Sequence, residues 1–169
     1  MGNVTLRAVE ARDLAAWREW INHPEVMEGL DRVLPATEEE HRTFVERNVA
    51  GNSSAVWFSL DAADGTYVGA IWLWDIHPRH RRAEVRLFVG HPEYGGQGIG
   101  AAAIAAISAY AFGSLGLHKL YAYVHVANAR SRAAFERSGF REEALLKGEA
   151  FRDGAFTDVA RLAAFAPSR

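Results

Sequence analysis

The sequence predicts a single α+β domain built on one mixed sheet of about seven strands with about four helices. The chain has 169 residues, 49% of them hydrophobic, which suffices for one substantial core and is short for two. Its apolar patterns follow the order strand, two helices, three strands, helix, strand, helix, two strands. Strands and helices therefore do not alternate strictly, as they would around a parallel sheet. No repeat or linker divides the chain, so we expect one domain over residues 1–169.

Apolar periodicity places the elements of the first half. The first helical pattern ends near His23-Pro24, because the residue before a proline avoids the helical region. Thr37 and Glu40 have the spacing of a capping box, in which both side chains bind free backbone N–H groups at a helix start. We therefore expect helices at residues 13–21 and 37–49 and strands at residues 4–9, 55–60, 67–74 and 83–89.

The second half begins with an uncharged, alanine-rich stretch. Its many Ala and Gly residues make membrane insertion unfavourable, so we interpret it as a helix packed closely on a sheet. The next helical pattern starts at Asn128 and ends at Ser138-Gly139, where glycine accepts the left-handed cap. We expect helices at residues 98–115 and 128–138 and strands at residues 119–126, 140–146 and 155–165.

Composition excludes several classes of function. Charged residues make up 24% of the chain and nearly cancel at a net charge of −2, which argues against nucleic-acid partners and a polybasic membrane anchor. The basic run at residues 79–82 is interpreted as a hairpin tip. The absence of cysteine removes disulfides and a cysteine acyl-enzyme, and the histidines lack metal-ligand spacing, so we expect no metal. The start of the chain has no signal pattern, which favours the cytoplasm.

A glycine cluster lies between a predicted strand and the alanine-rich helix. Four glycines fall between positions 95 and 100, so consecutive backbone N–H groups can face a diphosphate at a helix start. A turn that only lets the helix lie close to the sheet fits the same spacing equally well. A Rossmann site is excluded because no acidic residue lies between Glu93 and Glu136, and no Gly-Lys-Ser/Thr follows for a P-loop.

Several ordered motifs resemble the GNAT superfamily of N-acetyltransferases, over nearly the whole chain. They are Leu6-Arg7, residues 20–26, Gly96-Gln97-Gly98-Ile99-Gly100, residues 117–122, Asn128-x-x-Ser131 and Ser138-Gly139-Phe140. Within that superfamily, this sequence most resembles the branch that contains the ribosomal-protein N-terminal acetyltransferases and the spermidine and amino-sugar N-acetyltransferases. The resemblance implies a GNAT-like, mostly antiparallel central sheet and transfer of acetyl from acetyl-CoA, a cosubstrate, to an amine.

The resemblance also implies a coenzyme site. In that family the equivalent loop binds the coenzyme A pyrophosphate through backbone amides, and the preceding strand pairs with the pantetheine arm. The residues that match these positions are Phe88, Val89, Gly95, Gly96, Gln97, Gly98, Ile99, Gly100, Asn128 and Ser131. The sequence departs from the family at Gly95, where Arg, Gln or Trp is usual; because the contact is mainly through the backbone, we expect the loop still to bind, with the departure affecting the affinity.

Two residues are candidates for catalysis. Glu84 is the candidate base, because the family often places a carboxylate on the strand that enters the glycine loop; a charge paired with Arg82 or Arg86 is the alternative. Ser131 is the candidate proton donor, with a structural hydroxyl as the alternative. The family often uses a tyrosine where this chain has Phe135, which cannot donate a proton and for which we expect core packing.

The acceptor side is predicted from acidic residues beside aromatic ones. Glu28 and Asp31, together with Trp72 and Trp74, would suit a cationic amine, although a solvated loop and a core tryptophan pair explain the same residues. An α-amine with a pKa near 7.7–8.0 costs less than about 1 kcal/mol to deprotonate, against about 4 for a lysine-like amine.

The predicted reaction is acetylation of a primary amine, with a protein N-terminal α-amine as the first choice. A small amine, such as a polyamine, amino-sugar or aminoglycoside-type antibiotic, is the alternative. A weakly catalytic acyl-CoA-binding module is a further one, motivated by Phe135 and Gly95. The oligomeric state is left open, with a homodimer among the possibilities.

Overall fold

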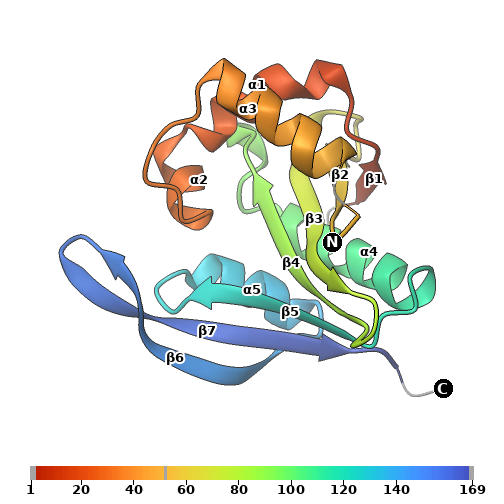
Figure 1. Ribbon diagram of the computed structural model, residues 1–169, viewed down its shortest axis with the longest axis vertical. Helices are drawn as coiled ribbons and strands as arrows, with labels where there is room; N and C mark the ends of the chain where they lie inside the picture. Colours follow the sequence, from red (N-terminus) through yellow and green to blue (C-terminus); the bar gives the residue numbers. More distant parts are fainter. Residues whose placement is uncertain (1–2, 52, 168–169) are drawn as a thin grey trace.

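The computed structural model describes residues 3–51 and 53–167, and these form one seven-stranded sheet (Figure 1). The strand order is β1-β2-β3-β4-β5-β7-β6, and all neighbouring strands are antiparallel except β4 and β5. The mostly antiparallel sheet is confirmed. The strands are β1 Val4–Arg7, β2 Val56–Ala62, β3 Tyr67–His77, β4 Arg82–Val89, β5 Lys119–His125, β6 Arg141–Arg152 and β7 Ala155–Phe165.

Five α-helices lie within the described residues, one more than the sequence predicts. They are α1 Leu14–Ile21, α2 Pro24–Gly29, α3 Glu38–Val45, α4 Ile99–Gly113 and α5 Ala129–Arg137. The additional helix is α2: Pro24 ends α1 as expected but also opens a new helix, since proline at a first helical position loses no hydrogen bond. The predicted helix at residues 37–49 is α3 followed by a π-helical segment, Glu46–Ala50.

The two faces of the sheet carry different layers. On one face α4 packs against β1, β3 and β4, and its Ile104 and Ile107 are fully buried with Leu73. On the other face lie α1 and α3 (Figure 1). They cover an aromatic layer in which Trp57 stacks on Trp72 with ring centroids 4.3 Å apart. Because side chains alternate along a strand, β4 contributes to both layers.

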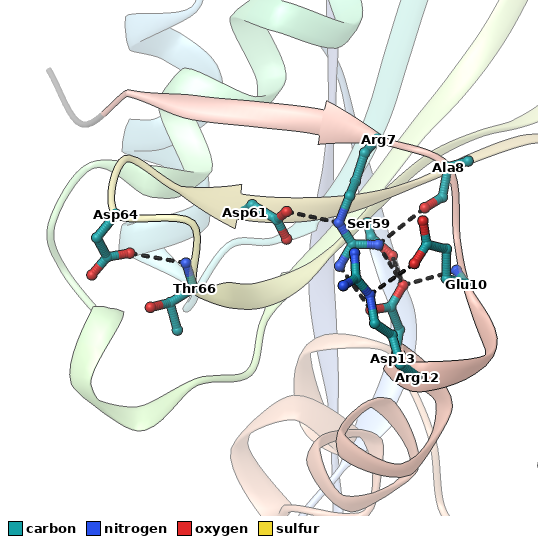
Figure 2. Close-up of polar contacts among 9 residues, drawn as sticks. All are labelled: Arg7, Ala8, Glu10, Arg12, Asp13, Ser59, Asp61, Asp64 and Thr66. Atoms are coloured by element: carbon teal, nitrogen blue, oxygen red, sulfur yellow. Dashed lines mark hydrogen bonds and ion pairs between the residues drawn. The ribbon is translucent and has the colours of Figure 1, made fainter.

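A buried carboxylate ties the first helix to the sheet (Figure 2). Asp13 is 1% exposed and accepts hydrogen bonds from Arg7 at 2.7 and 2.8 Å, from the Ser59 hydroxyl at 2.7 Å and from the Glu10 backbone N–H at 2.9 Å. Arg7 also donates to Asp61 at 2.7 Å. A buried charge needs such a full set of partners, and this set positions the start of α1 above β2.

The parallel pair β4 and β5 separates after three residues. Pairing joins Arg82 to Lys119, Ala83 to Leu120 and Glu84 to Tyr121, and then stops. Beyond Glu84 the strands diverge (Figure 1), so neither the rest of β4 nor the rest of β5 finds its partner in the other. Unpaired strand edges must meet other hydrogen-bonding groups, which makes the gap a place where a ligand can bind.

Candidate active site

Two cavities meet in the gap between β4 and β5. The first, which we call the loop cavity, measures about 330 Å³ and extends from the gap to the glycine loop and the start of α4. The second, the strand cavity, also measures about 330 Å³ and extends toward β5 and the β6–β7 hairpin. Leu87 and Ser131 line both. The two cavities therefore adjoin at the point where a donor and an acceptor could meet.

The glycine loop presents backbone amides to the loop cavity. Gly96 and Gly98 have positive φ angles of 77° and 81°, which glycine adopts without strain. Gly98 is the N-cap of α4 and offers no side chain to the first amides of that helix. Gly96, Gly98, Ile99 and Gly100 line the cavity, whereas Gly95 and Gln97 do not. The Gln97 side chain instead donates to the Glu93 carbonyl at 2.6 Å. The exposed amides suit an anionic group such as a diphosphate.

Gly95 leaves room for a side chain from α5. A Cβ atom added at Gly95 would lie 3.3 Å from Nη2 of Arg130, so the guanidinium lies directly over the glycine. Arg130 lines the loop cavity and forms no ion pair with another described residue. Where the family usually has a longer side chain in the loop, this chain has a cation from the helix beside it.

Arg137 is a second cation at the loop cavity. It follows Arg130 by two turns of α5 and lines the same cavity, again without an ion pair to any described residue. Neither arginine was predicted as a site residue. Their spacing of seven positions places both side chains on one face of a helix, which is the signal that the sequence offers. That this face is turned to the glycine loop follows only from the packing of α5 against α4. Free amides and two free guanidinium groups together fit a coenzyme that carries several phosphates.

The diverging edge of β4 forms one wall of the gap. Phe88 and Val89, two of the residues assigned to the coenzyme from the sequence, both line the loop cavity, and Phe88 is also part of the aromatic layer. Beyond Glu84 this edge has no strand partner in β5. An extended chain, such as a pantetheine arm, can hydrogen-bond to an open strand edge of this kind.

Glu84 lies where the two strands separate. Its side chain is buried, with 6% of the residue exposed, and it lines the strand cavity. Arg86 donates to both carboxylate oxygens, at 2.7 and 3.0 Å. The ion pair with Arg86 that the sequence offered as an alternative is therefore present, but the carboxylate does not face bulk solvent.

Asn128 and Ser131 open α5 beside the gap. The Asn128 side chain accepts a hydrogen bond from the Ser131 backbone N–H at 2.9 Å, which is the geometry of an N-cap. The Ser131 hydroxyl forms no hydrogen bond with another described residue. A free hydroxyl on the shared wall of the two cavities is placed to donate a proton there.

The aromatic residues near the gap have different roles. Phe135 is 2% exposed and packs edge-on against Phe140 with ring centroids 5.0 Å apart, as expected of a core residue. The Tyr121 hydroxyl binds Arg82 and Asp75 and does not line the strand cavity. Burial raises the pKa of Tyr121, an effect that the nearby Arg82 cation only partly offsets. Tyr123, which is 45% exposed, does line the strand cavity.

The predicted acceptor residues are not brought together in one place. Asp31 lines the strand cavity, while Trp72 lines a separate aromatic cavity of about 420 Å³ and is mostly buried against Trp57. Glu28 and Trp74 line none of these three cavities. The core-pair interpretation is therefore the better one for the two tryptophans, because Trp72 stacks on Trp57 and Trp74 meets the same ring edge-on at 6.4 Å between centroids.

Two further residues of the strand cavity were not predicted. Glu149 lies on β6 and forms no ion pair with another described residue, so its exposed carboxylate is available to a cation. His125, at the end of β5, lies 3.2 Å from Asp31. No sequence signal marked Glu149, because β6 extends six residues past its predicted end at residue 146.

Within residues 3–51 and 53–167, no group of three or more His, Asp or Glu side chains is placed to hold a metal ion. Of the helices described, none combines the length and the apolar character needed to cross a membrane.

Comparisons with known proteins agree with this geometry. Residues 3–141 match the acetyltransferase (GNAT) domain family. The spermidine N(1)-acetyltransferase of Vibrio cholerae is 30% identical over 159 residues, covering 94% of this chain and 91% of the relative. The putative ribosomal N-acetyltransferase YdaF of Bacillus subtilis is 33% identical, over 57% of this chain and 52% of the relative. A crystal structure of the Vibrio cholerae spermidine N-acetyltransferase in complex with CoA and spermine superposes with a TM-score of 0.88 at 28% identity, covering 97% of this chain and 96% of that one.

Proposed function

Because the chain belongs to the GNAT acetyltransferase family and is an acetyl-CoA-dependent N-acetyltransferase, we propose that its acceptor is a small polyamine. The observation that carries the proposal is the unpaired carboxylate of Glu149 in the strand cavity, beside Asp31 and Glu84. Polyamines carry a second cation at a distance from the reacting nitrogen, and a free carboxylate would bind that cation.

A protein N-terminus, the first choice from sequence, has less support. The relatives that span nearly all of this chain are spermidine acetyltransferases, whereas the ribosomal one matches 57% of it. A polypeptide also needs an open groove, and here Arg152 of β6 contacts Glu28 and also Asp31, which lines the strand cavity.

The coenzyme would be held by the loop cavity. The amides of Gly96, Gly98 and Gly100 would bind its diphosphate, with Arg130 supplying positive charge over Gly95. The edge of β4 would fix its pantetheine arm. Acetyl-CoA, when bound, supplies an acetyl group activated as a thioester.

The chemical task of the protein is to handle two protons. A polyamine nitrogen with a lysine-like pKa of about 10.4 is neutral in roughly one molecule in a thousand near pH 7.4, which costs about 4 kcal/mol. Glu84 would accept the amine proton, directly or through a water, and Ser131 would donate one to the departing sulfur. Phe135 leaves Ser131 as the better placed donor, since its ring cannot take that role.

The proposal is tested by measuring thiol release from acetyl-CoA with a panel of amines. We expect spermidine and spermine to give the highest kcat/KM, ahead of glucosamine and of a peptide with a free N-terminus. A polyamine should also bind to the CoA complex in calorimetry. Faster release with the peptide than with every polyamine would contradict the proposal and return the assignment to a protein N-terminus.

A further inference from the structure

One guanidinium contacts two residues that line the strand cavity, Asp31 and His125. Arg152, at the end of β6, donates to Oε1 of Glu28 at 2.9 Å and to Oδ1 of Asp31 at 2.8 Å, and it contacts the Glu28 backbone carbonyl closely. Its Nη2 also lies 2.8 Å from Nε2 of His125. The contacts join the β6–β7 hairpin to the end of α2 and the segment after it, more than one hundred residues away in sequence.

The arrangement places a cation of the protein where the sequence predicts a cation of the substrate. Glu28 and Asp31 are the two acidic residues assigned to the amine, and both are bound to the same guanidinium. Burial acts to raise the pKa of Asp31, but Arg152 and His125 outweigh it, so the pKa lies below its usual value and the group is a carboxylate. Asp31 is thus charged, and its charge is already compensated.

The pairing is more than a flexible surface contact. The Arg152 side chain is 20% exposed, although those of Glu28 and Asp31 are 71% and 67% exposed. A planar guanidinium that binds two carboxylates and a carbonyl is held in a fixed orientation, whereas the ammonium groups of a polyamine are point charges. A polyamine would have to break several directed hydrogen bonds to take its place.

We propose that Arg152 occupies a cation subsite next to the acceptor cavity, where it binds Asp31 of the cavity wall, and thereby limits how much of a polyamine the enzyme recognises. This inference rests on the proposed polyamine acceptor. With Arg152 in place, Glu149 is the free carboxylate of the cavity, so the enzyme binds one ammonium besides the reacting amine. Additional nitrogens of a longer polyamine find no uncompensated partner at Glu28 and Asp31.

The test compares the diamine putrescine with the triamine spermidine. In Arg152→Gln, Glu28 and Asp31 lose their cation, and we expect KM for spermidine to fall about tenfold relative to wild type, the value of one charge-assisted hydrogen bond. KM for putrescine and kcat for both amines should change little. Calorimetry on the CoA complex should show the same tighter binding of spermidine.

Controls separate this role from a structural one. Arg152→Lys keeps the charge and should keep the wild-type preference. Arg132→Gln removes a guanidinium that is likewise paired with two carboxylates, Glu136 and Glu142, and should leave both KM values unchanged. If Arg152→Gln does not fold, the double variant Glu28→Gln/Asp31→Asn makes the opposite change. The charge of Arg152 is then uncompensated. KM for spermidine should therefore rise more than KM for putrescine.

The possible results distinguish failure of this inference from failure of the proposed function. An equal rise of KM for both amines in Arg152→Gln would show that Arg152 only fastens the segment after α2, and it would overturn the inference. Unchanged KM values would overturn it as well. If the wild-type enzyme acetylates spermidine but Arg152→Gln does not change KM as predicted, the inference fails and the proposed function stands. No turnover of any polyamine by wild type would remove the proposed function and this inference with it.

Discussion

At the scale of single residues, the site depends on side chains whose partners are known. Glu84 is buried, lines the strand cavity and is held by Arg86 through both of its oxygens. The ion pair fixes the direction of the carboxylate, which a general base requires, since proton transfer needs hydrogen-bond distance to the amine or to one intervening water.

We predict that Glu84→Gln lowers kcat/KM for the preferred polyamine by about 100-fold, the lower end of the range for general acid–base catalysis. Steady-state thiol release measures this, with calorimetry to show that CoA still binds. Glu143→Gln is the matched control, because Glu143 is also a strand carboxylate paired with cations, Lys119 and Arg161. Equal turnover by both variants would restrict Glu84 to orienting Arg86.

Arg130 carries a second prediction at this scale. Arg130→Ala should raise the Kd for CoA about tenfold, because a hydrogen bond to a charged group contributes roughly 1.5–3 kcal/mol and 1.4 kcal/mol is a factor of ten. Gly95→Arg in the Arg130→Ala background should recover much of the affinity by returning the cation to the loop. Calorimetry measures both, with Arg132→Ala as the control. Unchanged affinity in Arg130→Ala would leave the loop amides as the main phosphate ligands.

At the scale of elements, short connections position the cavities. The segment between α2 and α3 is tied back by Asn22, whose side chain donates to the Ala36 carbonyl at 2.9 Å and accepts from the Ala36 N–H at 2.7 Å. Gly90, directly after β4, lies against the Trp20 ring, which an added Cβ would meet at 2.4 Å. These contacts hold α1 and α2 beside the end of β4, where the loop cavity begins.

The start of α1 is fastened to the sheet by Asp13, and this yields a prediction on stability. Burial raises the pKa of Asp13, but hydrogen bonds from Arg7, the Glu10 backbone and Ser59 outweigh it, so the pKa lies below the ordinary value of 3.8. Because the folded-state pKa is lowered, the stabilisation is complete above about pH 4 and is lost as pH falls through the folded-state value.

Asp13→Asn should therefore lower the free energy of unfolding by about 3 kcal/mol at pH 7, as expected when one partner of a buried ion pair is removed. The difference from wild type should begin to shrink below about pH 4, where the carboxyl of the unfolded chain is protonated, and should shrink further as pH falls through the lower folded-state pKa. Urea denaturation at pH 7 and at pH 3 measures both quantities. Asp153→Asn, at the turn between β6 and β7, is a control on the exposed surface. A pH-independent difference would contradict this account.

At the scale of the whole molecule, the topology of the sheet creates the site. The separation of β4 from β5 opens the gap, the glycine loop and α5 build the cavity on one side, and the β6–β7 hairpin closes the cavity on the other. Donor and acceptor would therefore enter from different sides and meet near Ser131, which lines both cavities.

The sequence by itself determined the order of the elements apart from α2, the glycine loop and the class of reaction. These depend on local signals: the period of apolar residues, the capping box at Thr37 and Glu40, and the glycines that accept positive φ at Gly96 and Gly98. The family motifs are similarly local. Such features are readable because each is set by neighbours within a few positions in the chain.

Only the tertiary structure decided which charges meet. Arg130 over Gly95, Arg152 between Glu28 and Asp31, and the free carboxylate of Glu149 each depend on elements that are far apart in sequence. The helix α2 was missed because proline both ends one helix and starts another. A single charged residue on an exposed strand or helix has no local pattern that names its partner, so packing alone assigns it.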